Sequence, residues 1–128
     1  MADSIARLYD AVLAARDGDP SISRTARLIR SGVPKAAKKM AEEAVEVVID
    51  AMNGRPEAVV QESADLIYNL VVLWAVAGVR PDEVWTEMER RERLLGIAEK
   101  LPKKDVTVPP LRRAVVAFAP RRGARKRR

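Results

Sequence analysis

Four acidic residues occur as two short steps whose spacing suits them to hold a cation. Glu43 and Glu46 are three residues apart, and Glu62 and Asp65 repeat that spacing. Side chains three residues apart lie on the same face of an α-helix. If both segments are helical and face each other, the four carboxylates form a cage of oxygens. Such cages hold Mg²⁺, and Mg²⁺ held by carboxylates also binds the phosphates of substrates.

The composition removes most other kinds of active site. The 128-residue chain contains no Cys and no His. Disulfides, thiolate nucleophiles, His-based triads and His-ligated zinc are therefore excluded. Acid–base or metal chemistry has to come from carboxylates, Lys, Tyr or water. Apolar residues make up 48% of the chain and aromatic residues only 4%, which favours an all-α fold of one domain.

The two acidic steps fall on neighbouring predicted helices. The first is expected over residues 34–52, with Pro34 in its first turn, and the second over 56–77, opened by Pro56 and ended by Gly78. The short linker between them predicts an antiparallel pair. The first helix has an apolar arc, Ala37, Met40, Ala41, Ala44, Val45, Val48, Ala51 and Met52. Its opposite arc is charged: Lys35, Lys38, Lys39, Glu42, Glu43, Glu46 and Asp50.

Three further helices are expected around this pair. One covers residues 4–16 with Ser4 as its N-cap, a shorter one covers 23–30, and a fifth runs over 81–95. Four apolar residues of the fifth helix are expected to face the core: Val84, Trp85, Met88 and Leu95. Gly96 is expected to end it.

Charge is distributed unevenly along the chain. The formal net charge is +6, but residues 101–128 hold ten basic residues and one acidic residue, so the body is mildly acidic. We therefore expect a domain over residues 1–102 and a basic tail over 103–128, extended or disordered. The start has no signal-peptide pattern, and the apolar run over 70–79 is too short to cross a bilayer. A cytoplasmic protein without a membrane partner is expected.

Three explanations of the acidic residues are open at this point. The acids of the first helix alone match a solvated charged face. The second helix is apolar almost all round, however, so Glu62 and Asp65 sit on an element that must be buried, and buried carboxylates need a compensating charge. That charge comes either from Lys38 and Lys39, as a structural ion network, or from Mg²⁺, with Mn²⁺ as a possible substitute.

Two runs around these acids resemble a known family. They are Lys38-Lys-Met-Ala-Glu-Glu-Ala-Val-Glu-Val and Glu62-Ser-Ala-Asp-Leu-Ile-Tyr-Asn-Leu-Val. Together they are similar to the phosphoribosyl-ATP pyrophosphatases of histidine biosynthesis, all-α nucleotide pyrophosphohydrolases of the MazG-like superfamily whose shared pattern is E-x-x-E, a spacer, then E-x-x-D. The similarity extends over about residues 23–100. The chain departs from the family at Asn69, where His is frequent, and at Ala41, where Gly is frequent.

The resemblance implies a reaction and roles for the acidic and basic residues. The enzyme would hydrolyse phosphoribosyl-ATP between its α and β phosphates, giving phosphoribosyl-AMP and pyrophosphate. Glu43, Glu46, Glu62 and Asp65 would hold Mg²⁺, and Glu42 or Glu46 would take the proton of the attacking water. Lys38 and Lys39 would stabilise charge on the phosphate oxygens, and Asn69, on the site face, could contact phosphate, nucleotide or metal.

The helix pair also predicts a homo-oligomer, because two long helices cannot bury the apolar surface of the helix over residues 56–77 on all sides. The resemblance implies the same, since members of the family are homodimers or larger. A four-helix bundle completed by a second copy is expected. Two rival functions remain: a MazG-like house-cleaning nucleoside triphosphate pyrophosphohydrolase, and a non-enzymatic helical module whose basic tail binds nucleic acid. We do not expect nucleic acid to be the main partner, because the tail is nearly without aromatic residues.

Overall fold

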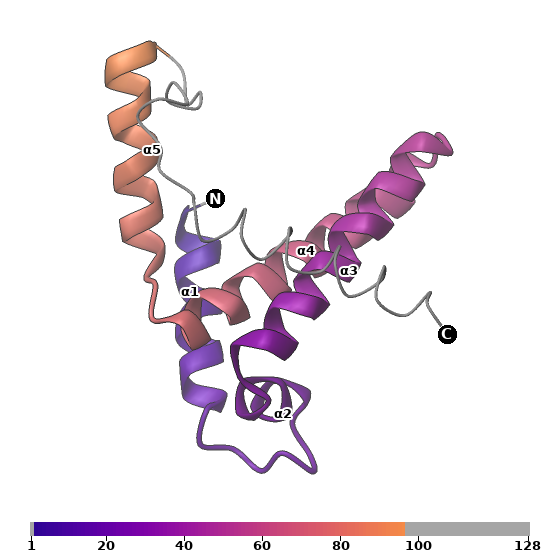
Figure 1. The fold of residues 1–128 in the computed structure, drawn as a ribbon, viewed down its shortest axis with the longest axis vertical. Coiled ribbons are helices and arrows are strands. Elements are labelled where there is room, and N and C mark those ends of the chain that lie inside the picture. The colour runs from indigo at the N-terminus through magenta and orange to yellow at the C-terminus, as the bar shows by residue number, and fades with distance from the viewer. Residues whose placement is uncertain (1, 97–128) are drawn as a thin grey trace, which may run out of the picture. The chain divides into compact units, whose positions relative to one another are not determined.

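The computed structural model describes residues 2–96, and within them every regular element is a helix (Figure 1). The five helices are α1 (Ala2–Ala15), α2 (Arg24–Arg30), α3 (Gly32–Met52), α4 (Pro56–Ala77) and α5 (Pro81–Leu95). The all-α prediction is therefore confirmed for the described part of the chain. The predicted boundary at residue 102 and the basic tail lie outside the described residues. Met1–Glu87 forms one compact unit, and the core and the site described below lie in it.

The ends of α4 and α5 agree with the sequence signals that predicted them. Pro56 stands at the first position of α4, where its missing N–H costs no helical hydrogen bond. Gly78 ends α4 in the left-handed conformation, at φ 79°, which glycine adopts without strain. α5 begins at Pro81 and is followed by Gly96, as expected.

The starts of α1 and α3 differ from the prediction. α1 already begins at Ala2, so Ser4 lies inside the helix, and its hydroxyl accepts a hydrogen bond from Arg7 instead of capping the helix. α3 begins at Gly32, two residues before Pro34. Ser31 serves both as C-cap of α2 and N-cap of α3, and the positive φ of Gly32, 86°, allows this abrupt connection.

The core joins α4 to α1 and α3. α3 and α4 form an antiparallel hairpin whose helices lie side by side (Figure 1), and this is the most extensive helix pair of the fold. α1 packs across the C-terminal half of α4. The buried apolar residues of this cluster are Ile5, Val12, Ala36, Val71 and Val72. α4 is thus the central helix, and it positions the residues it carries relative to both α1 and α3.

Two predictions about side-chain burial are wrong. Asp50, assigned to the outer charged arc of α3, is buried, and its carboxylate pairs with Arg55 at 3.3 Å. The chain turns back between these residues, so the guanidinium reaches the last turn of α3 and compensates the charge. Met88 and Leu95 of α5, expected in the core, are exposed, whereas Val84 and Trp85 are partly buried.

α4 is also the helix with the length and composition of a membrane span. It has 22 residues and a mean hydropathy of 1.3 over its most apolar stretch, and it is the single such helix among residues 2–96. The apolar run over residues 70–79 is therefore only part of a longer apolar helix. Only 17% of that stretch is buried within one chain. Core helices pass the same test, and α4 carries both the core residues Val71 and Val72 and three acidic residues, Glu57, Glu62 and Asp65.

Truncation of Val71 tests the central role of α4. Val71 is fully buried, so Val71→Ala leaves a cavity that the surrounding helices cannot fill. We expect it to lower the free energy of unfolding by about 2 kcal/mol, measured by urea denaturation at constant protein concentration.

Ile22→Ala is the matched control, because Ile22 is 82% exposed in the connection between α1 and α2. We expect it to change stability by less than about 0.5 kcal/mol. Equal effects of the two substitutions would contradict the core described here.

Candidate active site

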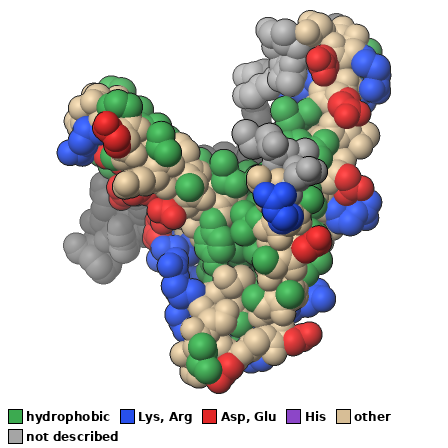
Figure 2. Space-filling model, turned by 180° about the vertical axis from the view of Figure 1, so that it is seen from behind, with side chains coloured by type: hydrophobic (Ala, Val, Ile, Leu, Met, Phe, Trp, Pro, Cys, Tyr) green, Lys and Arg blue, Asp and Glu red, His purple; other side chains and the backbone are tan. Residues whose placement is uncertain are grey.

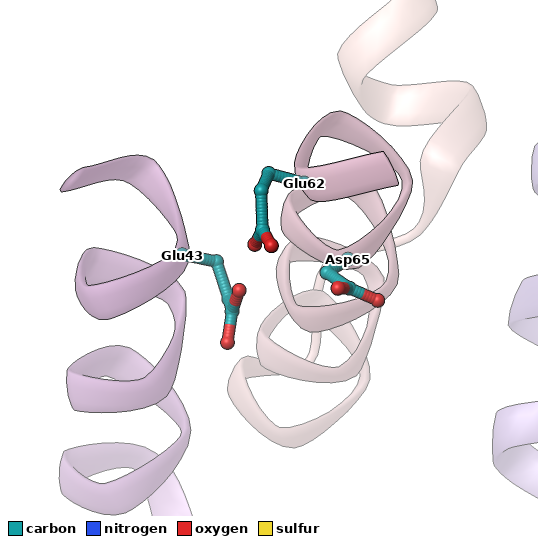
Figure 3. Close-up of side chains that lie close together, drawn as sticks. All are labelled: Glu43, Glu62 and Asp65. Atoms are coloured by element: carbon teal, nitrogen blue, oxygen red, sulfur yellow. The ribbon is translucent and has the colours of Figure 1, made fainter. Parts of the chain in front are cut away.

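Three carboxylates converge between α3 and α4. On the face seen in Figure 2, acidic side chains form a patch that adjoins a run of basic side chains. Figure 3 shows Glu43 projecting from α3 towards Glu62 and Asp65 of α4. One carboxylate oxygen of each residue lies within 4.8 Å of the other two. The two acidic steps therefore do meet across the hairpin, with one residue from the first and both from the second.

Asn69 extends this group along α4. Glu62, Asp65 and Asn69 follow one another at intervals of three and four residues, so they share one face of the helix. The side-chain nitrogen of Asn69 donates a hydrogen bond to the backbone oxygen of Asp65, at 2.8 Å. A carbonyl oxygen can only accept, so this bond settles the orientation of the amide. The other amide atom, Oδ1, is buried without a hydrogen-bond partner.

The Oδ1 of Asn69 indicates which kinds of ligand the site can accept. Asn69 is only 3% exposed, and a buried oxygen without a partner costs free energy. Oδ1 is an acceptor, so it matches a cation, a metal-bound water or a ligand hydroxyl, and it does not match a phosphate oxygen. Of the contacts that the sequence left open for Asn69, the geometry favours metal or nucleotide hydroxyl over direct phosphate contact.

α2 closes one side of this group. The hydroxyls of Thr25 and Tyr68 are 2.6 Å apart and form a hydrogen bond between α2 and α4. α2 is held at its start by its N-cap Ser23, whose side chain accepts from the backbone nitrogen of Ala26 at 3.1 Å. The resulting pocket of about 380 Å³ is lined by Arg24, Thr25, Glu43, Asp65, Tyr68 and Asn69. The pocket is therefore lined by polar side chains from three helices.

The basic residues nearby do not neutralise this group. Lys39 lies 3.7 Å from Glu42 and 3.8 Å from Glu43, so one lysine is shared between two carboxylates. Within residues 2–96, Glu62 and Asp65 form no ion pair with Lys or Arg. Lys39 therefore compensates only part of the charge of α3, Lys38 forms no ion pair among the described residues, and the acids of α4 are left without a compensating cation.

Repulsion among the acids changes the titration of Glu62. Desolvation of its carboxyl raises the pKa of Glu62 above the ordinary value of 4.5. Hydrogen bonding with Glu43 and the charge of Glu43 raise this pKa further, followed by the charges of Asp65 and Glu46. Glu62 thus takes up a proton more readily than an isolated glutamate, first because its carboxyl is desolvated and then because the neighbouring acids add negative charge.

The donor set suits a hard divalent cation. Every available donor of the group is an oxygen, from three carboxylates and one amide. Oxygen ligands of this kind favour Mg²⁺ or Mn²⁺ over zinc and copper, which prefer nitrogen or sulfur. Glu43, Glu62, Asp65 and Asn69 are the residues that could hold such an ion.

The other residues singled out from the sequence lie around this group. Glu46 is exposed one turn beyond Glu43 and is not among the three convergent carboxylates, although its charge acts on Glu62. Glu42 is exposed and paired with Lys39, and Lys38 is exposed. The roles predicted for Glu42, Glu46, Lys38 and Lys39 stay predictions.

Of the two pocket residues that α2 contributes, the sequence assigns no role to Thr25 and leaves Arg24 to solvent or an anion. Arg24 and Thr25 come from α2, which is remote from both acidic steps in the chain. Their signal was present in the Ser-Arg-Thr-Ala-Arg-Leu segment that takes part in the family resemblance. Nothing in its spacing, however, says that α2 packs against Tyr68.

Comparison with known proteins shows that this chain is similar to members of one enzyme family. The family model described as phosphoribosyl-ATP pyrophosphohydrolase matches residues 5–92. A protein of Rhodopseudomonas palustris named phosphoribosyl-ATP pyrophosphatase 2 is 71% identical over 109 residues, covering 85% of this chain and 83% of the relative. One of the same name from Bradyrhizobium diazoefficiens is 63% identical over 134 aligned positions, covering 99% of both. The phosphoribosyl-ATP pyrophosphatase of Gluconobacter oxydans is 53% identical over 94 residues, covering 73% of this chain and 71% of the relative.

The raised pKa of Glu62 predicts a pH dependence of stability in metal-free protein. A raised folded-state pKa contributes stability that is fully present below about pH 4.5 and is lost as the pH rises through the raised value. Glu62→Gln cannot acquire the charge. In chelator-treated samples we expect the melting temperature of this variant to exceed that of the unchanged protein at neutral pH, and the two to converge towards pH 4.5.

Glu57→Gln is the control, because Glu57 is exposed in the first turn of α4, apart from the three convergent carboxylates. We expect it to reproduce the pH profile of the unchanged protein. If Glu62→Gln did the same, the repulsion described here would be refuted.

Proposed function

Because the chain belongs to the phosphoribosyl-ATP pyrophosphohydrolase family, we propose that it hydrolyses phosphoribosyl-ATP between the α and β phosphates in a Mg²⁺-dependent reaction. The products are phosphoribosyl-AMP and pyrophosphate. The chain is an enzyme of the phosphoribosyl-ATP pyrophosphatase type. Its substrate, its metal and its mode of assembly are the parts of the proposal that experiment has to test.

One observation carries the proposal: Glu43, Glu62 and Asp65 are held together without enough positive charge to balance them. A triphosphate is also negatively charged, so it would be repelled by this group unless cations lay between them. Divalent metal ions can both balance the charge of the carboxylates and attract the triphosphate, since they bind carboxylate and phosphate oxygens at once. Mn²⁺ is the expected substitute for Mg²⁺.

The positions of the residues suggest separate roles in metal binding and in proton transfer. Glu43, Glu62 and Asp65, with Glu46 one turn further along α3, are the proposed metal ligands, and Asn69 offers a neutral oxygen beside them. When bound, Mg²⁺ supplies charge neutralisation at the phosphates and lowers the pKa of a coordinated water. Glu42 or Glu46 accepts the proton of the attacking water, since both are exposed carboxylates near the group.

Lysine residues of α3 are proposed to act on the phosphates. Lys39 lies beside Glu43 and is only partly exposed, so its ammonium is positioned at the edge of the acidic group. Lys38 is the neighbouring basic residue. Their positive charge favours the negative charge that builds up on phosphate oxygens as the anhydride breaks.

We also propose that the enzyme is a homodimer in which a second hairpin completes a four-helix bundle. Large apolar side chains on the hairpin are exposed within one chain: Val45, Val48, Ile49 and Met52 on α3, and Val60 and Ile67 on α4. Met52 is 82% exposed and Val60 is 69% exposed. An apolar surface of this kind is typical of an interface, and two-fold pairing buries it on both copies. The proposed enzyme is soluble and cytoplasmic.

The substrate is tested by measuring pyrophosphate release from phosphoribosyl-ATP, ATP and deoxynucleoside triphosphates. We expect turnover of phosphoribosyl-ATP that requires Mg²⁺ and is lost with chelator. Asp65→Asn removes a proposed metal ligand, and we expect it to lower kcat/KM by about 100-fold or more while far-UV circular dichroism stays unchanged.

Glu57→Gln serves again as the control with the same loss of charge on the same helix. Preference for ordinary or deoxy nucleotides over phosphoribosyl-ATP would favour the MazG-like house-cleaning function instead. Full activity of Asp65→Asn, or activity in chelator, would contradict the metal site.

The dimer is tested by Val48→Glu. This change places a carboxylate in the exposed apolar stripe of α3, where pairing would desolvate it, so we expect the variant to be monomeric at micromolar concentration in light scattering. Ile22→Glu makes the same change at an exposed apolar residue outside the hairpin, and we expect it to leave the mass unchanged. A monomeric unchanged protein, or an unaffected Val48→Glu dimer, would contradict the proposed assembly.

A further inference from the structure

A second pocket, beside the acidic one, is lined by positive charge. It has a volume of about 410 Å³ and lies between α2 and the first half of α3. Its basic lining residues are Arg24, Arg27, Lys35 and Lys39. The remaining lining residues are Leu28, Ser31 and Tyr68, so no carboxylate takes part.

Most of this positive charge is not neutralised by the protein. In the part of the chain that the structure describes, Arg24, Arg27 and Lys35 form no ion pair with a carboxylate. Arg27 donates to the backbone oxygen of Pro20, which holds its side chain without cancelling its charge. Lys39 alone is paired, with Glu42 and Glu43. Cations gathered in one concave site repel one another, and an anion bound among them removes that cost.

The basic and the acidic pocket are contiguous. Both are lined by Arg24 and Tyr68, so these two side chains form the boundary between them. The hydrogen bond between Thr25 and Tyr68 ties α2 to α4 at this boundary. A ligand that occupies the acidic pocket through metal ions therefore lies next to the basic pocket, with Arg24 at the boundary.

We propose that the basic pocket binds a phosphate group of the substrate that is not neutralised by metal ions. The proposal rests on the function proposed above. Guanidinium and ammonium groups bind phosphate through charge-assisted hydrogen bonds, and arginine does so with two parallel bonds. A phosphate that carries no metal ion is repelled by Glu43, Glu62 and Asp65. It is attracted by Arg24, Arg27 and Lys35. The acidic pocket therefore suits phosphates that bind metal ions, and the basic pocket suits a phosphate that does not.

Phosphoribosyl-ATP offers two sources of such a phosphate. One is the outer end of the triphosphate, which leaves as pyrophosphate, and the other is the 5-phosphate of the added ribose. The chemistry recognised is the same in both cases. Binding of the ribose phosphate would also select phosphoribosyl-ATP over ordinary nucleotides, which lack that group.

The test compares the unchanged protein with Arg27→Gln/Lys35→Gln and with Lys35→Gln alone. The single variant is included because Arg27 also bonds to Pro20, whereas no hydrogen bond or ion pair of Lys35 within the described residues is lost. Arg30→Gln is the matched control: it removes one positive charge from the same short helix, and Arg30 does not line the pocket. Circular dichroism and thermal unfolding verify that each variant folds.

Two sets of measurements are made at saturating Mg²⁺. In the first, kcat and KM are determined for phosphoribosyl-ATP. In the second, the affinities for pyrophosphate and for ribose 5-phosphate are measured by isothermal titration calorimetry. We expect the double variant to raise KM about tenfold with kcat changed less than about twofold, as for loss of charged hydrogen bonds made in binding. We expect Lys35→Gln to shift KM in the same direction by less, and Arg30→Gln to leave it unchanged.

The calorimetry identifies the source of the phosphate. Weaker binding of pyrophosphate assigns the pocket to the outer triphosphate, and weaker binding of ribose 5-phosphate assigns it to the ribose end; either result supports the proposal. Folded variants with unchanged KM and unchanged affinity for both ligands would overturn it. Failure of the unchanged protein to hydrolyse phosphoribosyl-ATP would refute the proposed reaction instead, and the two affinities would still decide the pocket.

Discussion

The repulsion among Glu43, Glu62 and Asp65 is the constraint to which the rest of the structure responds. Three carboxylates held with oxygens within 4.8 Å of one another are unfavourable in the absence of a cation, as the raised pKa of Glu62 indicates. The hairpin of α3 and α4 nevertheless keeps them there. The packing of α1 and α3 on α4, through Val12, Ala36 and Val71, holds α4 in place against that repulsion. Strain of this kind is common at functional sites, where a ligand relieves it.

Around these three carboxylates, most acidic and basic side chains lie apart instead of forming ion pairs. The acids of α4 have no basic partner within the described residues, while Arg24, Arg27 and Lys35 have no acidic one. Pairing the two sets would have stabilised the free protein and would have removed both binding surfaces. The separation, with Tyr68 and Arg24 at the boundary, is instead complementary to the substrate complex proposed above, with divalent cations at one part and bare phosphate at another.

The apolar surface of the hairpin has a different role from the apolar core. Val71 and Val72 are buried within one chain, whereas Val48, Met52 and Val60 are exposed. The buried residues lie in the half of α4 that meets α1, and Val60 lies in the half that carries Glu62. A second copy covering the exposed half would further desolvate the carboxylates and strengthen their interaction with any bound cation. In the proposed dimer, assembly and metal binding would thus be connected through the same helix.

The sequence alone determined which segments are helical, where α4 and α5 start and end, and which acids share a face. It could do so because these features are local: Pro56 and Gly78 mark the ends of α4, and the interval between Glu62 and Asp65 is one helical step. The tertiary structure decided which of Glu42, Glu43 and Glu46 faces α4, since periodicity specifies a face but the rotation of a packed helix depends on its contacts. It also decided that Asp50 is buried against Arg55 and that α2 brings Arg24 and Thr25 to Tyr68. Residues from three helices meet there through packing, which no spacing along one helix encodes.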